Sequence, residues 1–298
     1  MVREAVVMIN RRSRRCDQEL ERIHGLLRAH RIPVAAFHVV ASSKELRRCA
    51  KRAAKAGAPA VLAGGGDGTL AHAVDALAHS ETVLGVLPLG TGNSFAQSLG
   101  LDPHDIEAAV GVIARGNVGR IDLGRVNGTH FANFATIGIS SEIADATPTA
   151  VKRWAGPLAY GLAAIRLLLT HRSFRARIRW KGGELDVRTQ DIIVANGRFF
   201  GSTPVAPDAS LADGQLALYT RDDGSRAGAL RTYAAFGTNT QARLRGAHVV
   251  NAARFTIRTR AKQKISIDGS VLEKTPARFR VERGALQVFL PENGVARG

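Results

Sequence analysis

Short apolar runs alternate with amphipathic stretches over the first part of the chain. The runs at 5–9, 34–40, 60–63 and 83–87 predict strands, and the stretches near 17–30, 43–56, 69–78, 93–98 and 104–115 predict helices. Strands that alternate with helices in this way form a parallel sheet covered on both faces. The first part of the chain is therefore predicted to be an α/β domain with a Rossmann-like parallel sheet.

The pattern changes at Arg120, where short strand-like segments begin to follow one another closely. They lie at 122–126, 130–136, 174–180, 191–195, 215–220, 254–259, 264–268, 278–282 and 286–290, with helices predicted near 148–170 and 225–239. Asn127-Gly128 is the strongest hairpin signal. Many short strands favour an antiparallel sandwich. We expect domains at 1–123 and 124–298 with a cleft between them, and the extreme C-terminal segment packed back on the first domain.

The charge balance indicates an anionic partner. Lys and Arg number 42 against 25 Asp and Glu, which leaves a formal net charge of +17. A surface of this kind favours polyanions or anionic membrane, unless the arginines merely keep the surface solvated. Aromatic residues make up only 5% and no stacking platform is visible, so nucleic acid is not an expected partner.

The cysteines, the histidines and the longest apolar stretch indicate where in the cell the protein works and which sites it lacks in sequence. Cys16 and Cys49 lie far apart without a CxxC motif, which predicts free thiols in a reducing compartment. The nine histidines show no HxxxH pair, so the sequence does not predict a zinc site. The apolar stretch Trp154–Leu169 is short for a membrane span and Arg166 interrupts it. We expect a cytoplasmic protein that contacts the membrane surface peripherally; a homodimer is left open.

Two glycine-rich loops follow successive buried strands. The first is Gly64-Gly65-Gly66-Asp67-Gly68-Thr69, and the second, after the strand 83–87, is Leu89-Gly90-Thr91-Gly92-Asn93. Glycines let backbone N–H groups approach a ligand, and a helix start adds positive charge, so both loops predict phosphate binding. A carboxylate at Asp67 would repel phosphate unless a cation or a proton transfer intervenes. A third loop, Asn10–Arg15, offers an amide, a hydroxyl and four guanidinium groups.

These loops carry a specific resemblance. Asn10…Ser13, Gly65–Thr69 and Pro88–Ala96 resemble the three N-terminal signatures of the diacylglycerol kinase catalytic-domain family, which includes bacterial lipid kinases, sphingosine kinases and ceramide kinases. The likeness continues into the second half, where Asn133–Gly138, Pro157–Tyr160, Ala206–Gly214 and Ile267–Gly269 are similar to segments of YegS-like bacterial lipid kinases. NAD kinases share the first glycine loop alone, so the proline-led second loop distinguishes the two.

The resemblance implies an ATP- and Mg²⁺-dependent lipid kinase that phosphorylates a hydroxyl of diacylglycerol, phosphatidylglycerol or a sphingoid lipid. It implies a first domain like that of NAD kinase and phosphofructokinase. It assigns the nucleotide to Asn10, Ser13, Arg14, Ser42, Gly65, Gly66, Asp67, Gly68, Thr69, Gly90, Thr91 and Asn93, the metal to Ser210, Asp213 and Gln215, and catalysis to Asp67, Asp268 and Ser270. A simple Asp-Gly turn explains Asp213-Gly214 equally well from the sequence alone.

One departure from the family pattern bears on activity. The family motif Asp-Gly-Glu reads Asp268-Gly269-Ser270 here, and a serine is no base at neutral pH without an activating partner. Asp67 is one replacement, and Glu273 and Glu142 are others. The alternative to a kinase is therefore a catalytically weak lipid- or nucleotide-binding protein on the same fold. A soluble NAD kinase is less favoured because of the second loop.

Overall fold

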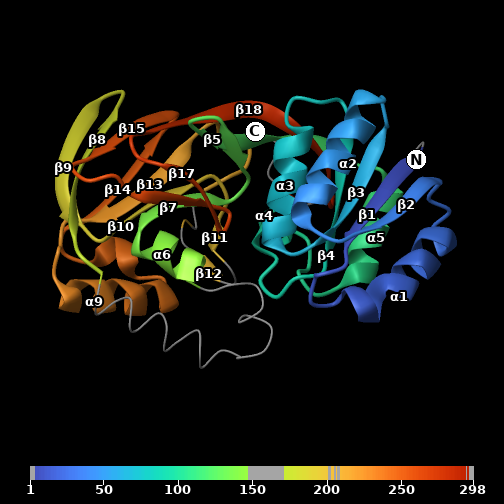
Figure 1. The fold of residues 1–298 in the computed structure, drawn as a ribbon, viewed down its shortest axis with the longest axis horizontal. Helices are drawn as coiled ribbons and strands as arrows, with labels where there is room; N and C mark the ends of the chain where they lie inside the picture. The colour runs from blue at the N-terminus through green and yellow to red at the C-terminus, as the bar shows by residue number, and fades with distance from the viewer. Residues whose placement is uncertain are drawn as a thin grey trace.

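The computed structural model describes residues 4–146, 171–200, 203–204, 206, 209–292 and 294. In Figure 1 the N-terminal part, blue to cyan, lies on the right, and most of the remaining chain forms a second body on the left. Strand β18 (Ala277–Phe289), drawn in red, runs along the top from one body to the other. An α/β domain and an antiparallel β sandwich were both expected, and this fold class is confirmed.

The first body is built on a parallel sheet with the strand order β2-β1-β3-β4. Its strands are β1 (Ala5–Asn10), β2 (Val34–Val40), β3 (Ala60–Gly65) and β4 (Val83–Pro88). The chain moves outward from β1 to β2 and then returns across β1 to form β3. The order therefore reverses between β1 and β3, and open α/β sheets bind ligands beyond the carboxyl ends of the strands at such a point.

Helices cover both faces of this sheet. They are α1 (Cys16–Ala29), α2 (Ser43–Lys55), α3 (Asp67–Leu77), the short α4 (Ser94–Ser98) and α5 (Ile106–Arg115). Helix α2 packs on α3 and α1 packs on α5, and right-handed crossovers place these pairs on opposite faces. Leu70, Val74 and Leu77 recur on one side of α3 and are fully buried. Burial of each such side chain contributes about 1.5–3 kcal/mol.

The second body is a sandwich of two mainly antiparallel layers. One layer contains β5 (Val118–Val126), β6 (Thr129–Phe131), β8 (Phe174–Trp180), β9 (Gly183–Thr189), β15 (Arg254–Thr259) and β18. The other layer contains, in spatial order, β14 (Ala247–Ala252), β13 (Leu216–Arg221), β10 (Asp191–Ala195), β7 (Phe134–Gly138), β16 (Lys264–Ile267) and β17 (Ser270–Lys274). Strand β8 shows the pattern: Phe174, Ala176 and Ile178 face the core between the layers, and the arginines between them are exposed.

Strand β18 joins the two bodies in one ten-stranded sheet. It pairs antiparallel with β15 and β5, and near its end Val288 pairs in parallel with Leu84 of β4. Two separate strands at 278–282 and 286–290 were expected, and this expectation is wrong. The segment is one strand with a register shift between Glu282 and Leu286, where Gly284 has a φ of 56°. A bulge of this kind bends a strand without ending it.

The hairpin at Asn127-Gly128 is confirmed, but its second arm is shorter than expected. Strands β5 and β6 pair around this two-residue turn. The predicted strand 130–136 is interrupted at Ala132-Asn133, and β7 then continues in the opposite layer. The chain thus crosses between layers beside Asn133.

Several smaller elements complete the described chain. Helix α9 (Arg226–Gly237) agrees with the helix expected near 225–239. Strands β9, β14 and β17 and helix α6 (Ile139–Ala146) were not expected. The remaining elements are β11 (Phe199–Phe200), β12 (Thr203–Pro204) and the 3-10 helix η1 (Gln241–Arg243). The helix predicted at 148–170 and the motif Pro157–Tyr160 lie outside the described residues. No helix among the described residues is long and apolar enough to span a bilayer.

Candidate functional site

Three loops meet where β1, β3 and β4 end. The β3–α3 loop and the β4–α4 loop touch at their glycines: a Cβ added to Gly66 would lie 3.1 Å from the Cα of Gly90, and one added to Gly90 would lie 2.5 Å from the Cα of Gly66. The second distance is shorter than any real contact of this kind, so a side chain at Gly90 would force the loops apart. The two predicted phosphate loops are therefore side by side.

A cluster of polar side chains lies beneath these loops. The buried Asn10 donates from Nδ2 to the Thr69 hydroxyl over 2.8 Å and to the Ser43 hydroxyl over 3.3 Å, and the two hydroxyls are 3.2 Å apart. Asn10 and Thr69 were predicted site residues, but Ser43 was not. The neighbouring Ser42 instead caps α2, where its hydroxyl accepts the N–H of Glu45 over 3.2 Å.

The loop after β1 covers one side of this cluster. Arg14 donates from Nη1 to the hydroxyl of Thr91 over 3.3 Å, which connects this loop to the β4–α4 loop. The Ser13 hydroxyl is buried and has no hydrogen-bond partner among the described residues. Buried polar atoms are rarely left without a partner. Ser13 is therefore a ready donor for an anionic ligand.

Asn93 holds the β4–α4 loop in shape. It is fully buried with a φ of 49°. Its side chain accepts the N–H of Gly90 over 2.9 Å and donates to the carbonyls of Gly90 and Pro103 over 3.1 and 2.7 Å. The geometry therefore gives Asn93 a shaping role in the loop.

Asp67 connects the two glycine loops. It is the first residue of α3, and its Oδ1 accepts the backbone N–H of Phe95 over 3.0 Å while Oδ2 accepts the Ser94 hydroxyl over 3.2 Å. These groups belong to the first turn of α4, whose own N-cap residue makes no side-chain cap. A carboxylate satisfies such free N–H groups and complements the helix dipole.

Asp268 enters the site from the second body. Asp268 and Gly269 have φ values of 44° and 84° and form the two-residue turn between β16 and β17, as a type I′ hairpin requires. The buried carboxylate accepts the N–H groups of Ala132, Asn133 and Phe134 over 2.9, 3.1 and 3.0 Å. Burial raises the pKa of Asp268 to about 6, and the negative charge of Asp67 adds to this increase.

Helix α4 links Asp67 to Asp268. Asp67 binds the first turn of the helix, and at its last residue Ser98 donates to the side-chain oxygen of Asn133 over 3.1 Å. The N–H of Asn133 in turn binds Asp268. This series of contacts and the direct effect of the Asp67 charge on Asp268 both put the two carboxylates at the junction of the two bodies.

The other residues considered for catalysis are Ser270, Glu273 and Glu142, and the two glutamates are hydrogen bonded to other side chains. Ser270 begins β17, directly after the Asp268-Gly269 turn. Glu273 lies farther along β17 and accepts from Thr129 over 3.2 Å. Glu142 contacts His171 Nδ1 over 2.8 Å. Of these three, Ser270 is nearest to Asp268 along the chain.

The loop predicted to hold a metal is an Asp-Gly turn. Asp213 is exposed, and its carboxylate accepts the N–H groups of Gln215 and Ser210 over 2.8 and 3.3 Å. The loop is anchored below by Asp122, which accepts the N–H of Gly214 over 2.7 Å. Carboxylate and carbonyl oxygens are suitable ligands for Mg²⁺, and an exposed carboxylate that already accepts two amides can still take a cation. Pro207 and Asp208 of the same motif lie outside the described residues.

Comparison with known proteins identifies the family. Residues 4–126 match the model of the diacylglycerol kinase catalytic domain, and residues 134–290 match that of the YegS C-terminal NAD kinase β-sandwich-like domain. A diacylglycerol kinase of Bacillus subtilis strain 168 is 30% identical over 268 residues, which are 86% of this chain and 85% of the relative. The chain belongs to the diacylglycerol kinase family. It is accordingly a phosphotransferase of the lipid-kinase type.

Further relatives agree with this membership. The diacylglycerol kinase of Staphylococcus aureus strain JH9 is 29% identical over 252 residues, covering 82% of this chain and 78% of the relative. Among solved structures, a candidate diacylglycerol kinase from Bacillus anthracis matches the fold with a TM-score of 0.84 at 23% identity, over 98% of this chain and 96% of that one.

Kinases of the diacylglycerol kinase family use ATP and typically a divalent metal, and the first body fits a nucleotide. The fit rests on the two glycine loops, which lie side by side at Gly66 and Gly90, and on the unpartnered Ser13 hydroxyl. The N-terminus of the 11-residue helix α3 opens at the same place, and helix N-termini bind phosphate.

A pocket lies on the outer face of the second layer of the sandwich. It has a volume of about 160 Å³, and its apolar lining includes Ile193, Ala195, Ala217, Tyr219 and Val249. Polar residues line it as well, among them Asp213, Gln215 and Asn251. Such apolar residues cannot be told from core residues in the sequence, because both are apolar and alternate along strands.

Proposed function

We propose that this protein transfers the γ-phosphoryl group of ATP, with Mg²⁺, to a hydroxyl of a lipid such as diacylglycerol, phosphatidylglycerol or a sphingoid lipid. The observation that carries the proposal is the meeting of two parts: the contacting glycine loops of the first body, and the buried Asp268 carboxylate of the second. Phosphoryl transfer depends mainly on positioning and on neutralisation of charge. The loops would position the phosphates, and Arg14 and bound Mg²⁺ would supply the positive charge.

The loops of the first body would hold the phosphates. The Gly66 loop, the Gly90 loop and the start of α3 lie together at one edge of the sheet. Ser13 would donate its free hydroxyl hydrogen, and Arg14 would add positive charge from above. Bound Mg²⁺ would neutralise the phosphate oxygens. Its proposed ligands are Ser210, Asp213 and Gln215.

Asp268 is the best-supported base for the acceptor hydroxyl. A base works best when its pKa is near the operating pH, and burial brings the pKa of Asp268 to about 6. Hydrogen bonding does not separate the two carboxylates, because Asp67 accepts two groups of the first turn of α4 and Asp268 accepts three backbone N–H groups. We assign proton transfer to Asp268 on its raised pKa, and assign to Asp67 the joining of the loops. Ser270, beside Asp268, would contact the acceptor hydroxyl without removing its proton.

The acceptor would reach the site with its chains on the second body. The pocket of about 160 Å³ supports this, since Ile193, Ala195 and Tyr219 offer an apolar surface. On the same layer Phe134 is hydrogen bonded to Asp268 through its backbone. The net charge of +17 supports a peripheral contact with anionic membrane.

A second candidate function is a lipid- or nucleotide-binding protein with little catalysis. Ser270 favours it, because the family motif carries a glutamate at that position. This candidate shares the nucleotide site and differs only in turnover.

The test uses the full chain with γ-labelled ATP and vesicles that contain one candidate lipid at a time. Labelled lipid should form with Mg²⁺ and not with a chelator, and Asp268→Asn, prepared in parallel, controls for contaminating kinases. If ATP binds but neither the parent nor Asp268→Asn labels any lipid above the chelator background, the protein is a binding protein and the kinase proposal fails.

A further inference from the structure

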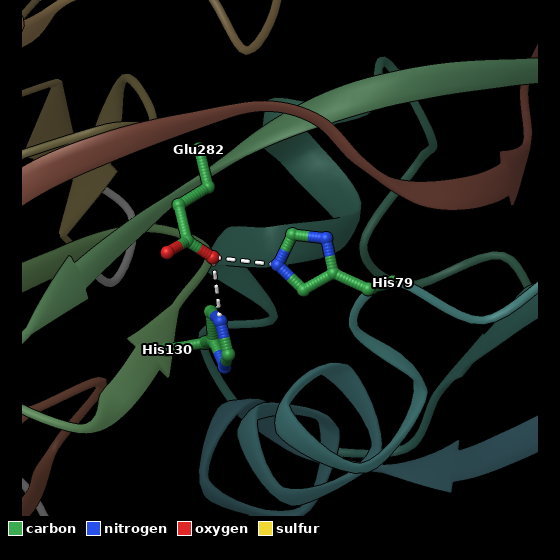
Figure 2. Close-up of side chains that lie close together, drawn as sticks. All are labelled: His79, His130 and Glu282. Atoms are coloured by element: carbon green, nitrogen blue, oxygen red, sulfur yellow. Dashed lines mark hydrogen bonds and ion pairs between the residues drawn. The ribbon is translucent and has the colours of Figure 1, made fainter.

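Two histidines and a glutamate converge on one point far from the glycine loops. His79 follows α3, His130 lies on β6 and Glu282 lies on β18. His79 Nε2 is 2.6 Å and His130 Nε2 is 2.9 Å from the same carboxylate oxygen, Glu282 Oε2. Figure 2 shows both imidazoles turned toward that oxygen. Within the described residues, this is the only cluster of three or more potential ligands close enough to share a metal ion.

The partners of His130 leave one nitrogen for a ligand role. His130 Nδ1 lies 3.1 Å from Asp75 Oδ1, and the same carboxylate accepts Arg47 Nε over 2.9 Å. A carboxylate at the far nitrogen fixes the ring orientation. A metal ion would displace the hydrogen through which Nε2 now bonds Glu282, and Nε2 would then donate its lone pair, as in carboxylate–histidine–metal groups. The side chains of His130 and Asp75 are only 12% and 13% exposed, so this orientation is held inside the protein.

Glu282 is held in the same way. Its other oxygen, Oε1, accepts Arg125 Nη1 over 3.0 Å and Arg280 Nε over 2.8 Å. Both arginines therefore contact the oxygen that faces away from the imidazoles, and Oε2 stays available. Their positive charges oppose a cation nearby and should weaken its binding.

His79 supplies the open side of the cluster. It has a φ of 61°, a conformation that is rare outside glycine, asparagine, aspartate and histidine. Its side chain is 56% exposed, which leaves a path for an ion from solvent. Ligand atoms around tetrahedral zinc lie roughly 3.3 Å apart, given Zn–N bonds of about 2.0–2.1 Å. A small rotation of this exposed ring would open the 2.6 Å contact to that spacing.

We propose that His79, His130 and Glu282 form a binding site for a divalent transition-metal ion such as Zn²⁺. Two imidazoles and one carboxylate suit zinc, and also cobalt and nickel, but not the oxygen-preferring Mg²⁺ of the nucleotide. The three ligands come from the end of α3, from β6 and from the strand that joins the two bodies. A bound ion would therefore fasten the α/β domain to the sandwich at the back of the kinase site.

The experiment measures the binding of Zn²⁺ and Co²⁺ to chelator-treated full-length protein by calorimetry, visible absorption of Co²⁺ and thermal melting. We expect one ion per chain, an absorption spectrum of histidine-ligated cobalt, and a melting temperature that rises with Zn²⁺. His79→Asn should weaken binding by about 100-fold or more, and Asp75→Asn by about 10- to 100-fold. Asparagine tolerates positive φ, so the first variant should fold.

His38→Asn is the matched control, because His38 is an exposed histidine on β2 outside the cluster. It should bind Zn²⁺ as the parent does. The proposal fails if the parent gives no cobalt absorption and no zinc-dependent rise in melting temperature. It fails equally if His79→Asn retains both signals, and the cluster is then an ion-pair network only. None of these readouts depends on lipid phosphorylation, so the outcome is independent of the proposed kinase activity.

Discussion

Asp67 and Phe95 join the two glycine loops: the Asp67 carboxylate accepts the Phe95 N–H over 3.0 Å, across 28 residues of chain. The same carboxylate also accepts the Ser94 hydroxyl. Because α4 has no side-chain cap of its own, this aspartate takes the capping role, and the backbone bond from the Leu89 N–H to the Gly65 carbonyl joins the same two loops over 3.0 Å.

Two substitutions at Asp67 separate its charge from its hydrogen bonds. Asp67→Asn keeps an oxygen for the Phe95 N–H, whereas Asp67→Ala leaves that N–H without its partner. Loss of a cap costs about 0.5–2 kcal/mol, so we expect the alanine variant to be less stable than the asparagine variant by an amount in this range. Chemical denaturation measures the difference. Equal stability of the two would show that capping is not the role of Asp67. Turnover of Asp67→Asn then reports the role of the charge alone.

Because Gly66 and Gly90 are in contact, we expect a single methyl group added at Gly90 to impair the use of ATP strongly. Gly90→Ala should lower kcat/KM for ATP by about 10²-fold, since displacement of a binding loop by about 1 Å can cost that much. Gly25→Ala on α1 is the matched control, because a Cβ there meets nothing within 4 Å. ATP titration and melting curves are measured on both. Unchanged ATP kinetics in Gly90→Ala would remove these loops from the nucleotide site.

Asp268 predicts a specific pH dependence. Burial and the charge of Asp67 raise its pKa to about 6, so the base is ionised above that pH and protonated below it. We expect kcat/KM to fall as pH drops through about 6, and we expect Asp268→Asn to lose about 10²–10⁴-fold activity together with this acid limb.

Stability should change in the opposite direction over the same range. The folded pKa lies above the ordinary value of 3.8, so the folded state takes up the proton first as pH falls. Protonation of Asp268 between pH 6 and 4 therefore raises the free energy of unfolding. Burial raises the pKa of Asp191 to about 6 as well, which adds to this trend. Activity lost near pH 5 without unfolding, measured by circular dichroism, supports the assignment; parallel loss of both contradicts it.

The fold was predictable from the sequence where burial was strong. All four strands of the parallel sheet were predicted because each is an apolar run between turn residues. Of the strands that were missed, β9, β14 and β17 are at the edges of the two large sheets, and β11 and β12 form a two-stranded sheet of two residues each. An edge strand has one neighbour and more exposed positions, so its apolar pattern is weak; in β9, for example, charged residues occupy alternate positions.

The site was predictable only in part, for a related reason. Loops after parallel strands meet at one edge, so the glycine loops could be placed together without a structure. Ser43 could not be distinguished from Ser42, because which hydroxyl caps α2 and which faces Asn10 depends on where the helix begins. His79 and Glu282 lie 203 residues apart, and only the pairing of β18 with β5 brings the glutamate to the histidines.

Asp213 predicts different results for a metal ligand and for a turn residue. Asp213→Asn keeps an oxygen that can accept the Gln215 N–H over the present 2.8 Å, but it loses the negative charge. If the loop binds Mg²⁺, this variant needs more magnesium for half-maximal activity, while its melting temperature stays close to that of the parent. Identical magnesium titrations for Asp213→Asn and the parent, with instability only in Asp213→Ala, would reduce Asp213 to a turn residue.

Ser270 separates the kinase from the binding protein. It stands directly after Asp268-Gly269, where the family motif has a glutamate, and it begins β17 opposite Ile267. If the lack of a second carboxylate limits turnover, Ser270→Glu should raise kcat by about 10²-fold, which is the size of effect that a positioned base has. The affinity for ATP should change little. If Asp268 already removes the proton, a further negative charge beside it should leave kcat unchanged or lower it. Ser270→Gln is the control, since it has the same length without the charge. Lipid phosphorylation by the parent, together with no increase of kcat in Ser270→Glu, supports Asp268 as the base. A large increase of kcat in Ser270→Glu that Ser270→Gln does not share would instead assign removal of the acceptor proton to position 270.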